Sequence, residues 1–510
     1  MSTAPTTTWN PSSLLAYDAL PNQLDDSDSD VKSATNFYDR SLTSRRCALA
    51  GVACTSIASC CCIIAGAVIT ASGGAATVMS AGRSGVALRK EMLVISLNLI
   101  VTLCTESTGF VHNISLRSAL DSESRLRFNS NLRLLTAARG WSNPNGALLN
   151  GIMVVLLIIS YSSVSLVTLT CYVMSLYEKT VLEVDIIGMP LLVLGIALLL
   201  QVVIALSGMR AAKILTWSSS SLDLTPALIH HSQLTPVLLR CMRSVSDFDV
   251  DGGPARPSET QPSAWHAHPS IRKVINSLWG LVIACAGWGA LILFIHNTYE
   301  SYTGTITWKS WSFFPDDQNF LYSLGYSPEL GWGPGPWIMC YINLAIIQGP
   351  LTLCLHCSEL IANVIRDEGH WRCGTEQKGI TPATNPLKSV IANPLCLALF
   401  VAKPALHWVF GLCFVLRAFQ VGPPGIDNPN DISTAINMYP MQILNLFIVL
   451  FVFACFFTLV ALRQRRGPQP AAYGHLQTLS NLVDEWTPVM WWGHKEDGIP
   501  YCHAGRVLVR

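Results

Sequence analysis

The chain has 510 residues, of which 50% are apolar and only 13% are charged, and its mean hydropathy is +0.39. A soluble protein carries about 25% charged residues, so this composition indicates a polytopic membrane protein. The formal net charge is +1, and the sequence has no zinc-finger, RNA-binding or P-loop pattern. These features argue against a nucleic-acid partner and against ATP-driven transport by this chain alone.

The N-terminal segment, residues 1–46, is polar and contains the acidic run DDSDSD at 25–30. This composition predicts a disordered tail, which the orientation below places in the cytosol. The first apolar run begins too far along the chain for a cleaved signal peptide, so we interpret it as a signal anchor.

Eight apolar runs are long enough to cross a hydrocarbon core about 30 Å thick at a rise of about 1.5 Å per residue. The predicted fold class is therefore all-α, a polytopic helical membrane bundle that spans residues 47–462. The first run is the weakest, because it is rich in small residues and leads into a Gly/Ser-rich loop. The predicted spans are residues 47–71, 92–114, 148–176, 186–208, 274–297, 337–365, 390–416 and 438–462.

The distribution of Lys and Arg orients these spans. Most Lys and Arg residues of the loops lie after the second, fourth and sixth spans and just after the eighth. The positive-inside rule places those loops, and hence both termini, in the cytosol, although Arg89 and Lys90 lie on the wrong side. An even number of spans with a cytosolic N-terminus argues against a G-protein-coupled receptor.

Three segments outside the spans are long enough to have structure of their own. They are a cytosolic linker (210–273), an outer aromatic loop (298–336) and a cytosolic C-terminal tail (463–510). The aromatic loop either anchors in the membrane interface or forms a small cap over a ligand entrance. The tail contains His494, Cys502 and His503, but without the spacing of a zinc site, so we predict no metal site and no cofactor.

Two pairs of short matches hint at an internal duplication. TLCTES (102–107) in the second span resembles TLCLHCSE (352–359) in the sixth, and HHSQLT (230–235) resembles HLQTL (475–479). A shift of four spans keeps the same orientation, so a parallel repeat of two four-span halves is topologically possible. The matches are short enough to arise by chance.

Polar residues recur at steps of three and four along the second and sixth spans, so each set shares one helix face. Lipid cannot satisfy such groups, and both stripes should therefore face the interior of the bundle. Gly349 and Pro350 interrupt the sixth span and predict a kink or break there. The stripes are Asn98, Thr102, Glu106, Gly109, Asn113 and Arg117, and Asn343, Gln348, Thr352, His356, Glu359, Asn363 and Arg366.

The seventh span contains VAKPALHW (401–408), in which Lys403 precedes a proline in an otherwise apolar run. Lys403 and Glu106 lie at similar depths, about 9–14 Å from the cytosolic ends of their spans. An unpaired charge at that depth costs about 2.5–3.5 kcal/mol, which favours a Glu106–Lys403 pair or a neutral lysine. His407 lies one turn farther out and could extend a chain of polar groups, whereas Glu359 is expected near the cytosolic interface.

Three interpretations of these residues remain open. The first is transport or sensing of a small solute or ion along a polar path between spans 2, 6 and 7. The second is a membrane-embedded enzyme or accessory protein of lipid or secondary metabolism, with Glu and His as acid and base. The third is a scaffold in which a buried ion pair only locks the helices together. Expected partners are membrane lipids, and the binding or relay candidates are Glu106, Lys403, His407, His356, Glu359, Asn98 and Asn113.

Three runs resemble an uncharacterised family of multi-pass membrane proteins of filamentous fungi. They are LCTESTGFVHNISLRSAL (103–120), LRFNSNLRLLTAARGWSNPNG (126–146) and HLQTLSNLVDEWTPVMWWGHKEDGIPYCHAG (475–505). The similarity extends over most of the chain from about residue 45. The resemblance implies a fungal host and a cytosolic tail with a defined fold, but no activity. The paired Asp-rich motifs of membrane prenyltransferases are absent from the sequence. The run NPND (428–431) is not such a motif, since it is expected to be a turn in an outer loop.

Overall fold

The computed structural model describes most of the chain from residue 42 onwards. The predicted acidic tail up to residue 41, most of the aromatic loop and the NPND turn lie outside the described residues. The described residues are 42–81, 83–173, 181–237, 240, 242–247, 258–299, 308–313, 324–326, 334–380, 391–420, 432–494 and 502–505.

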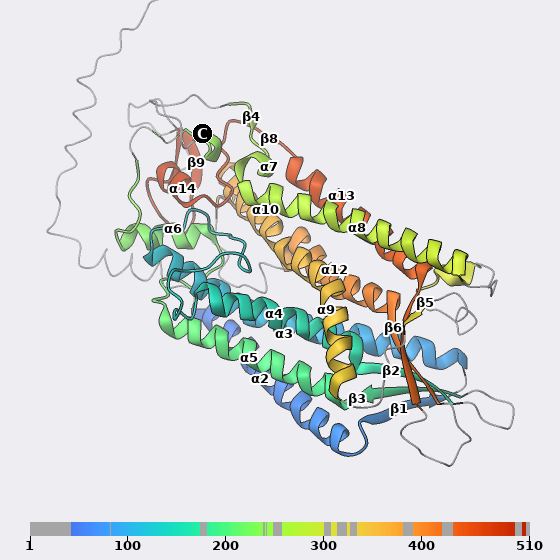
Figure 1. Cartoon of the computed structure of the whole chain (residues 1–510). Coiled ribbons are helices and arrows are strands. Elements are labelled where there is room, and N and C mark those ends of the chain that lie inside the picture. The colour runs from blue at the N-terminus through green and yellow to red at the C-terminus, as the bar shows by residue number, and fades with distance from the viewer. Residues whose placement is uncertain are drawn as a thin grey trace, which may run out of the picture.

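Within those ranges, eight helical segments are long and apolar enough to cross a membrane, which confirms the predicted number of spans. The sixth is made of two helices that are separated only by Ser358. The segments lie side by side in an elongated bundle (Figure 1). They are α2 (Leu42–Ala71), α3 (Arg83–Ser122), α4 (Ala147–Val167), α5 (Gly188–Ala211), α8 (Pro269–Tyr299), α9 (Pro334–Cys357) with α10 (Glu359–Arg372), α12 (Pro394–Cys413) and α13 (Pro440–Leu462).

One end of the bundle carries a β-sheet that was not predicted from the sequence (Figure 1). Its six described strands lie in the order β1-β3-β2-β6-β7-β5. Two predicted spans were too long, because the chain leaves the helix at Val167 and at Cys413 and continues directly as a strand. The strands are β1 (Ala75–Ala81), β2 (Thr168–Val173), β3 (Val181–Ile187), β5 (Leu324–Tyr326), β6 (Phe414–Gln420) and β7 (Ile432–Met438).

The strand order shows an approximate two-fold symmetry. The central strands β2 and β6 pair in parallel, and on either side β3 with β1 and β7 with β5 follow in antiparallel pairing. The helices pack with the same symmetry when α2, α3, α4 and α5 of the first half are matched with α8, α9, α12 and α13 of the second. The contact of α2 with α5 then matches that of α8 with α13, and the contact of α3 with α12 matches that of α9 with α4. This arrangement is the one expected of two parallel four-span halves and supports the duplication that the short sequence matches suggested.

The opposite end of the bundle is covered by a cap of short elements from the linker and the C-terminal tail (Figure 1). In the described part of the cap, α14 packs on α6, and β4 pairs with β8. The described parts of the loops that the Lys and Arg count assigned to one side therefore lie at one end, while their cytosolic location remains a prediction. The cap includes α6 (Ser221–His230), β4 (Thr260–Gln261), α7 (Ala264–Ala267), β8 (Arg465–Arg466), α14 (Leu476–Leu482), β9 (Trp491–His494) and β10 (Cys502–Gly505).

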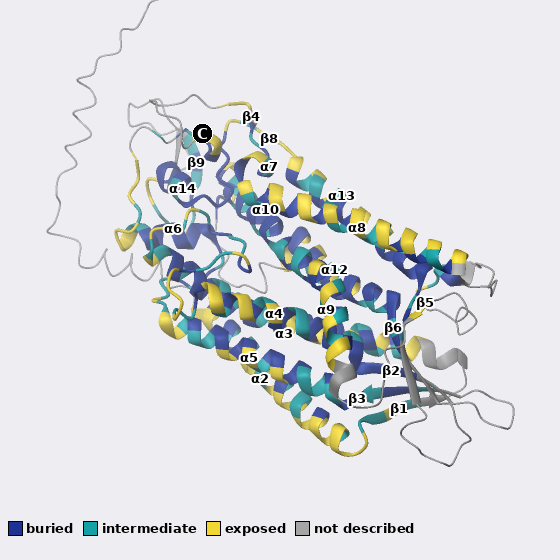
Figure 2. Cartoon of the chain, viewed as in Figure 1, coloured by how far each residue is buried: buried dark blue, intermediate teal, exposed yellow. Residues whose placement is uncertain are grey.

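Buried polar groups hold the C-terminal tail in the cap. Glu368 on α10 accepts hydrogen bonds from the backbone N–H groups of Ala472 and Tyr473 at 2.9 and 2.8 Å. Arg117, the last member of the polar stripe on α3, donates to Asn129 Oδ1 at 2.8 Å, and the backbone N–H of Asn129 donates to Gly474 O in the tail at 2.9 Å. Figure 2 shows this region largely buried, whereas exposed positions follow the outward faces of α8 and α13. The described part of the tail thus belongs to the folded unit.

His268 makes the stability of the cap depend on pH. Its buried ring packs on Phe128 with the centroids 4.2 Å apart, and burial lowers the pKa of His268 to about 4. The unfolded chain, with a histidine pKa of about 6.5, therefore binds the proton more readily, and up to roughly 3 kcal/mol is lost as the pH falls from about 6.5 to 4. We expect the wild-type melting temperature to fall over this range and the fall to be smaller in His268→Gln. Parallel profiles for the two proteins would contradict this role.

Candidate functional site

Lys403 lies on the buried face of α12 and is only 2% exposed. Its ammonium group donates hydrogen bonds to Glu106 Oε1 on α3 and to Glu359 Oε1 on α10. Its Nζ atom is also 3.5 Å from His356 Nδ1 on α9. The predicted Glu106–Lys403 pair is confirmed. Glu359, which was expected near the interface, shares the same lysine, so one cation joins two carboxylates from the two halves of the fold.

The start of α12 determines which face carries the lysine. Pro394 occupies the first turn, and the Asn393 side chain accepts from the N–H groups of Leu395 and Cys396 at 3.0 and 3.3 Å. This cap fixes where the helix begins and hence the direction of each later side chain. The helix continues through Pro404, which has no N–H to donate to the preceding turn.

The sixth span brings His356 and Glu359 together at the junction of α9 and α10. His356 Nδ1 lies 2.9 Å from Glu359 Oε1, a contact between residues three apart along the chain. The prediction of a kink or break at Gly349 and Pro350 is wrong as to a break, because α9 continues as one helix through both residues and the break in the span falls at Ser358. The functional candidates therefore lie beside the junction, one on each helix.

Arg133, which was not among the predicted site residues, completes the charge balance of the cluster. It comes from the irregular segment between α3 and α4, and its Nη2 atom is 3.7 Å from Glu359 Oε1. Its guanidinium lies against Gly109, where any Cβ would collide with it. With His356 neutral, the two carboxylates are matched by the two cations. The sequence signal was the glycine in the polar stripe, which leaves room for a long side chain.

Polar contacts continue from the cluster towards the sheet. His407 Nδ1 lies 3.2 Å from Gln348 Nε2, and the His407 ring stacks on Tyr161 with the centroids 3.7 Å apart. The Tyr161 hydroxyl in turn lies 3.1 Å from Thr102 Oγ1. His407 thus extends the chain of polar groups as expected. Tyr161 was not singled out, although the polar run SYSSVS (160–165) in an otherwise apolar span was a usable signal.

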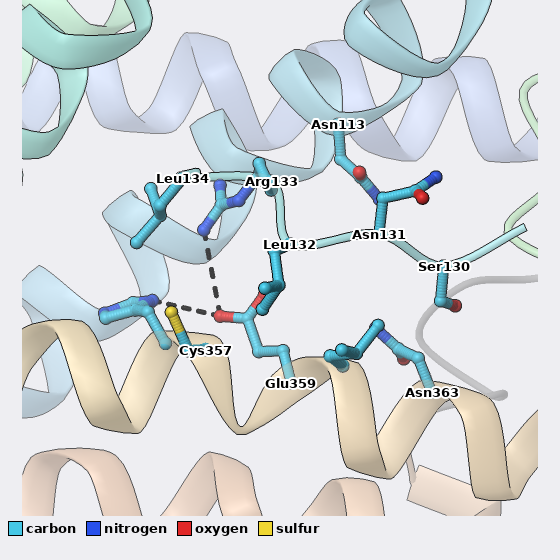
Figure 3. A pocket seen from close by; sticks show the side chains of 11 residues that line it. Asn113, Ser130, Asn131, Leu132, Arg133, Leu134, Cys357, Glu359 and Asn363 are labelled. Atoms are coloured by element: carbon cyan, nitrogen blue, oxygen red, sulfur yellow. Dashed lines mark hydrogen bonds and ion pairs between the residues drawn. The ribbon is translucent and has the colours of Figure 1, made fainter. Parts of the chain in front are cut away.

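The two asparagine candidates do not contact Lys403. Asn98 is buried on α3, and its side chain donates to Val94 O of the same helix at 2.9 Å. Asn113 lines a small cavity on the cap side of the cluster, and Glu359 lines the same cavity (Figure 3). Asn98 therefore has a local structural contact, and Asn113 belongs to the surroundings of the cluster.

Three of the clustered side chains have the spacing of a metal site. The ligand atoms of Glu106, His356 and Glu359 lie within 4.8 Å of one another. One imidazole and two carboxylates form a donor set that suits divalent transition metals. In the wild-type chain the Lys403 ammonium binds the same two carboxylates, so the protein supplies this positive charge itself.

The chain matches no protein-family model, no curated protein and no solved structure. The resemblance to the fungal membrane-protein family therefore stays a prediction.

Proposed function

We propose that this protein is a membrane transporter that moves protons along the polar path between α3, α9–α10 and α12. Lys403, shared between Glu106 and Glu359, is the observation that supports this proposal. Ionisable groups inside membrane spans are costly and usually mark ion or proton pathways. The cluster lies where the two symmetric halves meet, and transporters built from repeats carry their ion sites at such interfaces.

The proton is the species that fits the groups along the path. The path contains carboxylates, imidazoles, an ammonium and a phenol, and each of these can release or accept a proton. The small cavity that Glu359 and His356 line measures ≈ 20 Å³, which is room for about one or two water molecules. His356 Nδ1 lies close to both Glu359 and Lys403, so it is placed to pass a proton between them.

Proton flux into liposomes tests this proposal. The purified protein is reconstituted with a trapped pH-sensitive dye, and a potassium gradient with valinomycin supplies the driving potential. We expect internal acidification by the wild type and a loss of about 100-fold in Lys403→Met, because a positioned proton-transfer group contributes at least that much. The matched control is Lys273→Met, since Lys273 is exposed on α8 close to the cap.

Two outcomes would contradict the proposal. One is wild-type flux no faster than that of protein-free liposomes. The other is equal flux in the wild type and in Lys403→Met, which would leave the cluster as a clamp between helices.

A further inference from the structure

The small cavity beside the cluster has walls from both halves of the fold. It lies between α3, α10 and the irregular segment at 130–134. Figure 3 shows the side chains of Asn113 and Asn363 on opposite walls, from α3 and α10 respectively, with Ser130 between them. Glu359 and Arg133 line the other side of the same cavity, so it connects directly with the charge cluster.

Several polar groups in this cavity lack a protein partner. Among the described residues, the side chains of Asn113, Ser130 and Asn363 make no hydrogen bond to protein; Ser130 is buried, at 7% exposed, and the two asparagines are half-buried. Buried polar groups in proteins are nearly always hydrogen-bonded, either to protein or to ordered water. A polar cavity of ≈ 20 Å³ that offers several such partners meets the requirements for about one or two bound water molecules.

The position of the two asparagines follows the internal symmetry. When TLCTES (102–107) is aligned with TLCLHCSE (352–359), Thr102 matches Thr352. The same offset along the chain places Asn113 opposite Asn363, so the two asparagines occupy equivalent positions in the second and sixth spans. Each half therefore contributes an equivalent carboxamide to the cavity.

We propose that this cavity binds water and forms the access route by which protons reach Glu359 from the cap. The water site stands on the geometry alone, whereas its role as a proton route rests on the proposed function. A hydronium ion in the cavity would give one proton to Glu359 Oε2, the oxygen that makes none of the contacts with Lys403, His356 and Arg133. An O–H bond breaks in the hydronium and one forms on the carboxyl group. Neutral water then remains, and Lys403 keeps Glu106 as its charged partner.

Hydroxyl-radical footprinting of the purified full-length chain detects the water directly. X-ray radiolysis converts bound water into radicals that oxidise adjacent side chains, and mass spectrometry then reads the rate at each cysteine. Cys357 lines the cavity, whereas Cys354, one turn earlier on α9, is also half-buried but does not line it. We expect Cys357 to be oxidised about fivefold faster than Cys354, because only Cys357 adjoins the cavity water. Equal rates in the wild type would overturn the proposal without any variant.

Asn113→Leu and Asn363→Leu remove the polar partners that hold the water. Each should lower the oxidation rate of Cys357 to that of Cys354, while Asn98→Leu, on α3 but away from the cavity, should leave it unchanged. An unchanged Cys357 rate in both cavity variants would overturn the proposal.

The same variants, assayed for proton flux in liposomes, separate this inference from the proposed function. We expect both cavity variants to lose flux. Fast Cys357 oxidation in a protein that conducts no protons would keep the water site and overturn proton transport. Wild-type flux with slow Cys357 oxidation would keep transport and overturn this access route.

Discussion

We expect Lys403→Met to lower the free energy of unfolding by up to about 3–5 kcal/mol, because the buried Lys403 is the cation that two part-buried carboxylates share. Glu106 would keep no cation of its own, and Glu359 would keep only Arg133 at 3.7 Å. Unfolding of the purified protein in a denaturing-detergent titration measures the change. Lys273→Met, at an exposed position on α8, should change the unfolding free energy by less than about 0.5 kcal/mol.

The double variant Glu106→Gln/Lys403→Met tests whether the loss comes from unbalanced charge. It leaves Glu359 opposite Arg133, so the cluster is formally neutral again. We expect it to recover at least about half of the stability that Lys403→Met loses, since contacting groups in one ion-pair network are not additive. A double variant no more stable than Lys403→Met would show that Glu106 and Lys403 are not energetically coupled.

Lys403→Ala should convert the cluster into a binding site for a divalent transition metal. Removing the ammonium group frees the carboxylates of Glu106 and Glu359, which lie with His356 Nδ1 at metal-ligand spacing. With Zn²⁺ at about 100 times its dissociation constant, binding would stabilise the folded protein by about 2.7 kcal/mol. The measurement is the melting temperature of Lys403→Ala with and without Zn²⁺.

The wild type and Lys403→Ala/His356→Ala are the controls for this metal site. Neither should gain stability from Zn²⁺, because the first keeps its ammonium group and the second lacks the imidazole ligand. An equal Zn²⁺ effect in all three proteins would mean that the metal binds elsewhere. No effect in Lys403→Ala would mean that the three side chains cannot converge on one ion.

The helical part of the fold was predictable because lipid imposes a simple rule on sequence. Any crossing segment needs about 20 apolar residues, and all eight were recognised from that requirement. The sheet was not recognised, because β2 and β6 follow their helices without a turn or a polar boundary. Their apolar, β-branched and aromatic residues satisfy the pattern of a longer span as well as that of a strand.

Part of the charge cluster could be predicted from the energetic cost of an unpaired charge inside a membrane span, without any known sequence motif. A lysine and a glutamate at matching depth must be paired or neutralised, and that requirement alone identified Glu106 with Lys403. Arg133 could not be assigned in the same way, because its segment is irregular and only the three-dimensional path returns it to Gly109. The position of the helix interruption at Ser358 was also missed, since α9 accommodates Pro350 without a break.

Proton flux through the double variant Glu106→Gln/Lys403→Met is the most direct test of the central claim, that the cluster carries protons. This variant keeps the formal charge balance, so a change in flux is separated from a loss of folding. The proposal predicts that the variant folds, as shown by a single cooperative melting transition, and that its flux in liposomes falls to that of protein-free vesicles. Wild-type flux in the folded double variant would contradict the proposal and leave the cluster as a structural contact between the two halves.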